Sequence, residues 1–218
     1  VSSANKIIVF EGHSASDDDG VYAEIFNPSG TTTLATFRVN TTTDGKQHSA
    51  AVAVGASGDF IVTWAGRGIG DREGIFFQRY TATGTAVGGE TRVNTTVGGV
   101  QETPMVAIAA DGSFTIAWAG VGTGDVSGVF MRRYSSTAVA AANEVRINTT
   151  TTSDQIAPDI AYDSSGNLVA AWASRNQDGS DWGVYVQRYN ASGVAQGTAF
   201  AANSTTNNSQ TNPDVAID

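Results

Sequence analysis

The 218-residue sequence contains no cysteine. This absence excludes disulfide bonds, cysteine-ligated zinc, iron–sulfur clusters and thiol nucleophiles. Only two histidines are present, His13 and His48, and neither lies in a recognised nucleophile or metal-binding motif. No apolar run approaches the roughly 18 residues of a membrane-spanning helix, so we expect no membrane insertion.

Charge is also scarce, because charged residues make up 15% of the chain against roughly 25% in an ordinary globular domain. The 12 basic and 21 acidic residues give a net charge of −9. Affinity for phosphates comes mainly from clustered cations, so this composition argues against a nucleic-acid partner. Hydrophobic residues still reach 40%, which is enough for a sizeable core, and the length favours a single domain over residues 1–218.

The residues that are abundant recur with a fixed period. Trp64, Trp118 and Trp172 are 54 residues apart, and Phe10 stands 54 residues before Trp64. A period of 54 or 55 residues also relates Gly20, Gly74, Gly128 and Gly183, then Asn40, Asn94, Asn148 and Asn203, and then Gln47, Gln101, Gln155 and Gln210. Four units of this length account for nearly the whole chain, which indicates a repeat architecture.

Each unit is composed of predicted strands. The unit that begins at Gln101 contains four short runs rich in β-branched and aromatic residues, without helical periodicity. Turn residues such as Asp111-Gly112 separate the runs and supply the positive φ angles that tight hairpins need. Four strands in each tandem unit are typical of propeller blades, so we predict an all-β fold, a four-bladed β-propeller with four antiparallel strands per blade. An open β-solenoid or two sandwich domains would have the same strand count.

The two ends of the sequence favour a ring. Residues 210–218 match the first strand of a unit, as in residues 155–163, and residues 5–10 match the second strand, as in residues 59–64. We predict that the C-terminal strand pairs with the N-terminal strands of this split blade and closes the ring. The predicted blades span residues 210–218 with 1–46, 47–100, 101–154 and 155–209. Because the sequence begins inside an element, we also expect neighbouring domains in a larger parent protein.

A resemblance to a known repeat becomes clear around Gln187-Arg-Tyr. Residues 177–193, which include Gln177-Asp-Gly-Ser and Gly183-Val-Tyr, resemble a repeat of very large bacterial secreted and surface proteins. The match covers all four units and is weakest in the split unit, which has Glu24-Ile-Phe where the others have Gln-Arg-Tyr or Arg-Arg-Tyr. The resemblance implies an adhesin- or hemolysin-type parent that is secreted or attached to the bacterial cell surface, and it implies little about activity.

Acidic residues gather in the loop between the second and third strands of the units, most densely in the first and last. Ca²⁺ prefers several oxygen ligands from a turning backbone, so Asp17, Asp19, Asp178 and Asp181 are candidate calcium ligands. The simpler interpretation is that these aspartates cap turns through their side chains. The sequence indicates no other cofactor.

Trp182 is the one tryptophan outside the repeated position, and it lies in such a loop near Asn176 and Asp178. A flat aromatic ring among amide and carboxylate groups can stack on a sugar. These three residues are therefore candidates for binding a glycan or another cell-surface ligand. The alternative is that Trp182 packs locally under its loop, because tryptophan is highly buried on average.

Signals for catalysis are weak in the sequence. A retaining glycosidase needs two carboxylates about 5 Å apart, and no acid stands apart from the repeat as a unique catalytic residue would. No Walker-type phosphate loop is present. We therefore expect no enzymatic activity, and a non-catalytic extracellular binding or scaffold module that serves adhesion or ligand display. A lectin-like carbohydrate-binding propeller and a glycan hydrolase are the alternatives.

Overall fold

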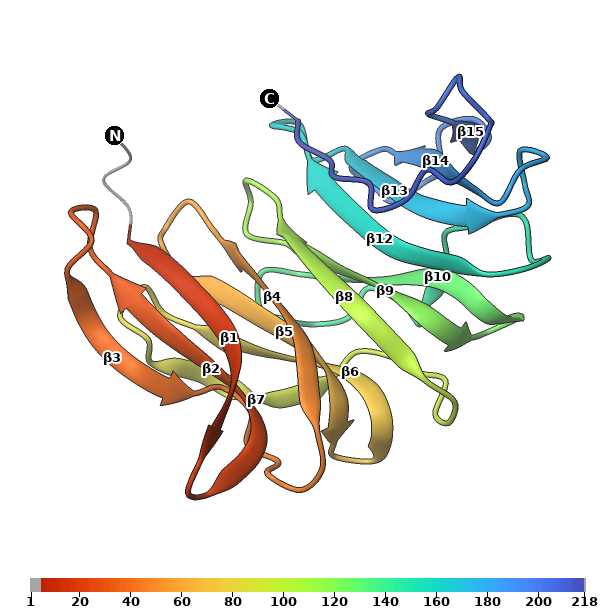
Figure 1. Cartoon of the computed structure of the whole chain (residues 1–218). Coiled ribbons are helices and arrows are strands. Elements are labelled where there is room, and N and C mark those ends of the chain that lie inside the picture. Colours follow the sequence, from red (N-terminus) through yellow and green to blue (C-terminus); the bar gives the residue numbers. More distant parts are fainter. Residues whose placement is uncertain (1–4, 218) are drawn as a thin grey trace.

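Four antiparallel β-sheets follow one another along the chain in the computed structural model, which describes residues 5–217 (Figure 1). These residues include no helix that is long and apolar enough to cross a membrane. The first sheet has three strands and each of the others has four, and we term them blades 1 to 4. Sequential neighbours pair in every blade, as in a meander of hairpins. The predicted all-β class with propeller-type blades is confirmed.

The strands of each blade are consecutive in the chain. Blade 1 contains β1 Lys6–Ser14, β2 Asp17–Phe26 and β3 Thr32–Arg38. Blade 2 contains β4 Gln47–Val54, β5 Phe60–Gly68, β6 Asp71–Tyr80 and β7 Ala86–Arg92. Blade 3 contains β8 Gln101–Ile108, β9 Phe114–Gly122, β10 Asp125–Tyr134 and β11 Val145–Arg146. Blade 4 contains β12 Gln155–Tyr162, β13 Leu168–Arg175, β14 Trp182–Tyr189 and β15 Phe200–Ala201.

The hydrophobic core lies between successive blades. In one buried cluster, Val21 and Ala23 of β2 are grouped with Val62 and Trp64 of β5. Two further clusters join β6 to β9 and β10 to β13 in the same way. The repeated tryptophans Trp64, Trp118 and Trp172 are at most 1% exposed and belong to these clusters. Burial of apolar surface contributes roughly 25 cal/mol per Å², which makes these interfaces a main source of stability.

A group of three hydrogen-bonded polar residues joins each blade to the segment that follows it. In blade 2, Asn94 Nδ2 donates to Asp71 Oδ2 at 2.7 Å and to Gln101 Oε1 at 3.2 Å, and Asn94 Oδ1 accepts the N–H of Ile75 at 2.9 Å. We term this group the Asp–Asn–Gln clasp. Its equivalents are Asp17–Asn40–Gln47, Asp125–Asn148–Gln155 and Asp178–Asn203–Gln210. The clasp explains why Asp, Asn and Gln recur at fixed spacing.

The structure differs from the prediction in how the chain ends meet. Among the described residues, β1 is an edge of blade 1 and residues 210–217 pair with no strand, so the predicted closure of the ring is not seen. The cause is that this segment lies along blade 4. Gln210 Oε1 accepts from Asn203 at 3.1 Å, and the N–H of Val215 donates to Asp159 at 2.6 Å. Blades 1 and 4 consequently stand at the two ends of the row (Figure 1).

Candidate functional site

The first strands of blades 2, 3 and 4, which are β4, β8 and β12 and which we term the inner strands, share a strained bulge with the C-terminal segment at one position of the repeat. Ser49, Thr103, Ala157 and Asn212 have left-handed backbones, with φ angles of 54°, 50°, 50° and 55°. The first three lie where the pairing of β4, β8 and β12 with their neighbours shifts register. Such a conformation costs a residue other than glycine about 1–3 kcal/mol, and strain of this kind clusters at functional sites. The same strained left-handed residue is therefore present in three blades and in the C-terminal segment.

These bulges line a single pocket of about 270 Å³, which we term the axial pocket. Equivalent parts of three inner strands and of the C-terminal segment form its wall, namely residues 49–51, 103–105, 157–158 and 212–213. Its volume is near the lower end of the range for small-molecule sites, roughly 300–1,000 Å³. The repeat thus brings segments that are distant in sequence to one small cavity.

Two carboxylic acids stand next to the segments that line the axial pocket. Asp159 and Asp214 each follow a strained bulge residue by two positions, and the Asp214 carboxyl lies near enough to Asp159 to raise its pKa. Asp159 is half-buried and Asp214 is exposed. Burial raises the pKa of Asp159 and the Asp214 carboxyl raises it further, which outweighs the opposing hydrogen bond from the N–H of Val215. Asp159 therefore retains its proton to a higher pH than an ordinary aspartate, as a general acid must.

A third carboxylate reaches the pocket wall from blade 1. Glu11 of β1 is exposed, and its Oε1 accepts the backbone N–H of Ser49 at 2.6 Å. The equivalent positions of blades 2, 3 and 4 hold alanine, at residues 65, 119 and 173. The axial pocket is consequently bordered by acids from blade 1, blade 4 and the C-terminal segment.

The sequence-based prediction that no acid stands apart from the repeat did not take account of these three acids. Asp159 and Asp214 occupy the repeat position that holds Ala51 in blade 2 and Met105 in blade 3. Glu11 likewise replaces an alanine. The conclusion that no acid stands apart from the repeat is therefore wrong. An alignment of the four units with each other would identify these acids, because it shows a carboxylate in one unit where other units have an apolar residue.

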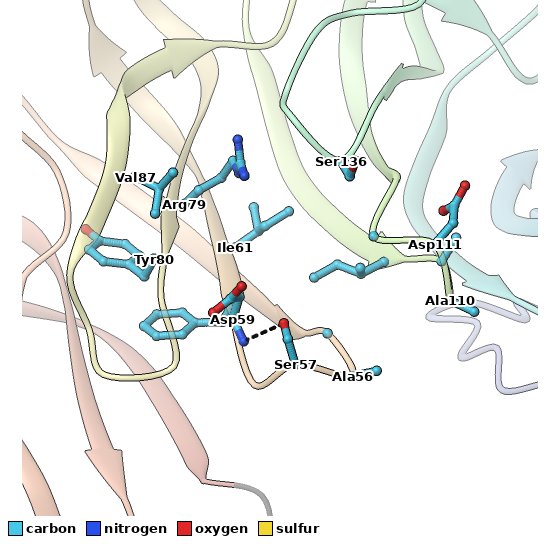
Figure 2. Close-up of a pocket in the computed structure, with 15 residues that line it drawn as sticks. Ala56, Ser57, Asp59, Ile61, Arg79, Tyr80, Val87, Ala110, Asp111 and Ser136 are labelled. Carbon is cyan, nitrogen blue, oxygen red and sulfur yellow. Dashed lines mark hydrogen bonds between the residues drawn. The ribbon is translucent and has the colours of Figure 1, made fainter.

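A second pocket of about 300 Å³ lies between blades 2 and 3, at the opposite end of the inner strands (Figure 2). Asp59 and Arg79 line it from blade 2, and Asp111 and Ser136 line it from blade 3. Hydrogen bonds from the hydroxyl and N–H of Ser113 lower the pKa of Asp111. That carboxyl is held in its ionised form and cannot supply a proton, so the axial pocket is the better candidate for acid–base chemistry.

Two of the predicted calcium ligands are clasp residues. Asp178 Oδ2 accepts from Asn203 at 3.3 Å, and Asp178 Oδ1 accepts the N–H of Ser180 at 3.0 Å. Asp17 holds the same position in blade 1, where it is 3% exposed and accepts from Asn40 at 2.7 Å. Hydrogen bonds within the loop and clasp thus use the oxygen atoms of both aspartates, in agreement with the simpler interpretation that they order turns.

The other predicted residues lie at the surface of blades 1 and 4. Asp19 and Asp181 are exposed, and Asp181 forms an ion pair with Arg175 at 3.2 Å. Asn176 has a left-handed φ of 59°. Trp182 is half-buried, and the Arg175 guanidinium lies 5.9 Å from its ring centroid. Asn176, Asp181 and Trp182 of blade 4 do not form one site with Asp17 and Asp19 of blade 1, because the two blades stand at opposite ends of the row (Figure 1).

Within the described part of the chain, no cluster of three or more His, Asp or Glu side chains is arranged to hold a metal ion. Calcium binding at the two loops stays a prediction, and calorimetry tests it: Ca²⁺ added to chelator-treated protein should release heat and raise the melting temperature. Binding of a glycan by Asn176, Asp178 and Trp182 likewise stays a prediction.

Comparisons with known proteins bear on the fold. No family model and no curated protein matches the chain. Similar solved structures include an α-L-arabinanase from Penicillium chrysogenum complexed with arabinobiose, with a TM-score of 0.59, 13% identity, and coverage of 95% of this chain and 62% of that one. A GH43 endo-arabinanase from Bacillus licheniformis has a TM-score of 0.53 and 13% identity, with coverage of 94% and 78%. An α-L-arabinofuranosidase from Lactobacillus brevis has a TM-score of 0.53 and 14% identity, with coverage of 91% and 74%.

At this level of identity the similarity establishes a shared fold. The chain spans about three-fifths to three-quarters of the neighbours' lengths. The neighbours' names are those of glycan-cleaving enzymes. This finding corrects the prediction of a non-catalytic module for adhesion or ligand display, and with it the prediction that the chain is not an enzyme. The prediction rested on the regularity of the repeat, whereas Asp159, Asp214 and Glu11 replace alanine or methionine of the repeat beside the axial pocket.

Proposed function

We propose that the chain is a glycan hydrolase whose axial pocket binds the sugar. The observation that carries this proposal is the half-buried Asp159, which holds its proton next to Asp214 beside the pocket. The shared fold with arabinan-cleaving enzymes supports the class of reaction. A glycan substrate also suits the secreted or surface location that the sequence resemblance implies, because polymeric glycans are met outside the cell.

In this proposal the carboxyl groups have different roles. Asp159 donates its proton to the glycosidic oxygen as the bond to the sugar carbon breaks. The Asp214 carboxyl raises the pKa of Asp159, so we assign Asp214 to holding the proton on Asp159. Glu11, on the blade 1 side of the pocket, is the carboxylate assigned to take a proton from the attacking water.

Activity assays of matched variants test the proposal. Release of reducing ends from arabinan, and of aglycone from aryl arabinofuranosides and galactosides, covers the substrates that the neighbours' names suggest. Asp159→Asn is expected to lower kcat by about 10²–10⁴-fold, the usual contribution of a general acid. The control Asp18→Asn changes a carboxylate whose side chain is 94% exposed, and it should leave activity unchanged. Absence of turnover by the unmodified protein over this panel between about pH 4 and 8 would contradict the proposal.

A further inference from the structure

The pocket of about 300 Å³ between blades 2 and 3 has a narrower equivalent of about 170 Å³ between blades 3 and 4. In that equivalent, Arg133 of β10 reaches across to blade 4, where its Nη2 donates to the carbonyl of Ala191 at 2.6 Å. The Arg133 guanidinium lies so close over Gly193 that a Cβ atom on this glycine would overlap it. An arginine thus spans this junction of two blades and narrows the cavity.

The junction of blades 1 and 2 is also closed by a side chain that lies over a glycine. Ile25 of β2 holds the repeat position of Arg133, and Gly84 holds that of Gly193. A Cβ atom on Gly84 would lie 3.0 Å from Cδ1 of Ile25 and would overlap Leu34. Gly84 and Gly193 both have positive φ angles, of 85° and 80°. Closure of both junctions therefore depends on a residue without a side chain beneath the closing group.

Between blades 2 and 3 the same repeat position holds Ala138. Its φ angle of 64° is left-handed, which is a strained conformation for a residue with a Cβ atom. The methyl group occupies the space that Arg79, the equivalent of Arg133, would need in order to reach the carbonyl of Ser136. Arg79 is half-buried and lines the pocket, and among residues 5–217 its side chain has no hydrogen bond and no ion pair. The strained alanine therefore keeps the pocket open, with the guanidinium available inside it.

The charged groups of the pocket determine which ligands fit. A guanidinium binds a carboxylate through two parallel hydrogen bonds. Asp59 Oδ1 accepts the N–H of Ala82 at 3.0 Å. Asp111 Oδ1 likewise accepts the N–H of Ser113 at 2.9 Å, and the described residues provide no partner for the Oδ2 atom of either aspartate. The two carboxylates repel a ligand that is only anionic and attract an ammonium group, so a zwitterion matches the pocket.

The uncharged part of the lining is aliphatic. Ile61, Val87 and Ile108 line the pocket from both blades, and Figure 2 shows Ile61 and Val87 beside the guanidinium. Two aromatic residues also line the pocket, but Phe60 and Tyr80 are only 1% and 5% exposed. Neither offers an open ring face on which a sugar stacks. The lining therefore fits an aliphatic chain better than a sugar ring.

We propose that the pocket between blades 2 and 3 binds a small aliphatic α-amino acid. The ligand's carboxylate lies on Arg79, its ammonium group lies near Asp59 and Asp111, and its side chain packs on the aliphatic lining. The volume is near the lower end of the range for small-molecule sites, which suits a ligand of this size. This site is at the opposite end of the inner strands from the axial pocket, so it is additional to the site proposed for hydrolysis.

NMR titration of the isotopically labelled protein with L-leucine tests the site, and two analogues test its charge pattern. 4-Methylpentanoate lacks the ammonium group, and 3-methylbutylamine lacks the carboxylate. L-Leucine should shift the amide signals of residues 56–61 and 109–113 and reach saturation. Each analogue should bind at least about tenfold more weakly, because each loses a charge-assisted hydrogen bond. No saturable shift with L-leucine, equal affinity for either analogue, or shifts confined to other residues overturns the proposal.

A pair of arginine variants tests the role of the guanidinium. Arg79→Met retains the aliphatic stem and removes the charge, and it should weaken L-leucine binding at least about tenfold. The matched control is Arg188→Met, which changes the equivalent arginine of blade 4, where the guanidinium lies 5.9 Å from the ring centroid of Phe200. This control should leave the affinity unchanged. Equal affinity of Arg79→Met and the unmodified protein overturns the proposal.

Ala138→Gly tests how the pocket is kept open. Without the methyl group, Arg79 should lie over residue 138 as Arg133 lies over Gly193, and the pocket should close. We expect L-leucine binding at least about tenfold weaker, with a melting temperature that is unchanged or raised because glycine relieves the left-handed strain. A variant that binds L-leucine as the unmodified protein does would show that the alanine does not hold the site open, and would overturn the proposal.

Discussion

Asp159 and Asp214 occupy the same repeat position in successive segments, and the Asp214 carboxyl raises the pKa of Asp159. Asp214→Asn removes the negative charge that helps to keep the proton on Asp159. We expect the pKa of Asp159 to fall, and the high-pH limb of the activity profile to move to lower pH by a similar amount. NMR titration of the Asp159 carboxyl measures the first effect, and initial rates against pH measure the second. An unchanged pKa of Asp159 would show that burial alone raises it.

The same pair affects stability with a definite sign. The pKa of Asp159 is raised in the folded protein, so the folded state binds more protons than the unfolded state between the two pKa values. Its contribution to stability is present below the unfolded pKa and is lost as pH rises through the folded pKa. Asp159→Asn removes this titration. The variant should therefore gain stability relative to the unmodified protein as pH rises from about 4 to 7, measured by urea unfolding at each pH.

Glu144 should stabilise the junction of blades 2 and 3 in the opposite pH sense. Burial opposes its ionisation, but hydrogen bonds from Thr96, Thr95 and Thr123 outweigh burial and lower the pKa of Glu144. The stabilisation is present above the unfolded pKa and is lost as pH falls through the folded pKa. Glu144→Gln should cost roughly 1–3 kcal/mol at pH 7, with a smaller deficit in acid.

A matched control for Glu144 is Glu73→Gln, which alters an exposed carboxylate and should change stability by less than about 0.5 kcal/mol. Urea unfolding of both variants at pH 7 and pH 3 tests the difference. If the deficit of Glu144→Gln is the same at both pH values, the ionised carboxylate is not the stabilising form.

The four clasps should contribute unequally to the free energy of unfolding. Asn94 is 1% exposed and makes its clasp bond to Asp71 at 2.7 Å, so Asn94→Ala strands a buried carboxylate and a buried N–H. We expect a loss of roughly 2–4 kcal/mol. Asn203 is only half-buried and lies 3.3 Å from Asp178, so Asn203→Ala is expected to cost about half as much. Thermal and urea unfolding compare the two. Equal losses would argue that solvent exposure of the clasp is unimportant.

Trp182 provides a test of the glycan surface that the sequence suggested. Its ring is half-buried and partly covered by Arg175. If the ring stacks on a sugar, Trp182→Ala should weaken binding of arabinan oligosaccharides at least about tenfold in isothermal titration, because stacked aromatic contacts contribute on the order of 1 kcal/mol or more. Arg175→Ala is the companion variant and should uncover the ring. Unchanged affinity in both would assign Trp182 to local packing.

Whether the sequence predicts a structural feature of this protein depends on whether the feature is local in the chain. Trp64, Trp118 and Trp172 identified the blades, because the alternation and spacing that bury a residue are written into each 54-residue unit. The aspartates of the acidic loops illustrate the limit. Blade 4 has one extra residue in this loop, so spacing alone allows either Asp178 or Asp181 at the repeated position, and the hydrogen bond from Asn203 shows that Asp178 is the clasp residue.

The sequence by itself determined the all-β class, the four units and the exclusion of cysteine chemistry, since these follow from composition and periodicity. The tertiary structure alone decided which residues meet at the axis and what remains exposed at the ends. Asp159 and Asp214 are 55 residues apart in sequence, and the raised pKa of Asp159 arises from burial and contact that no local pattern encodes. The uncovered Ile8 likewise depends on how far the row of blades turns, which is set by packing between blades.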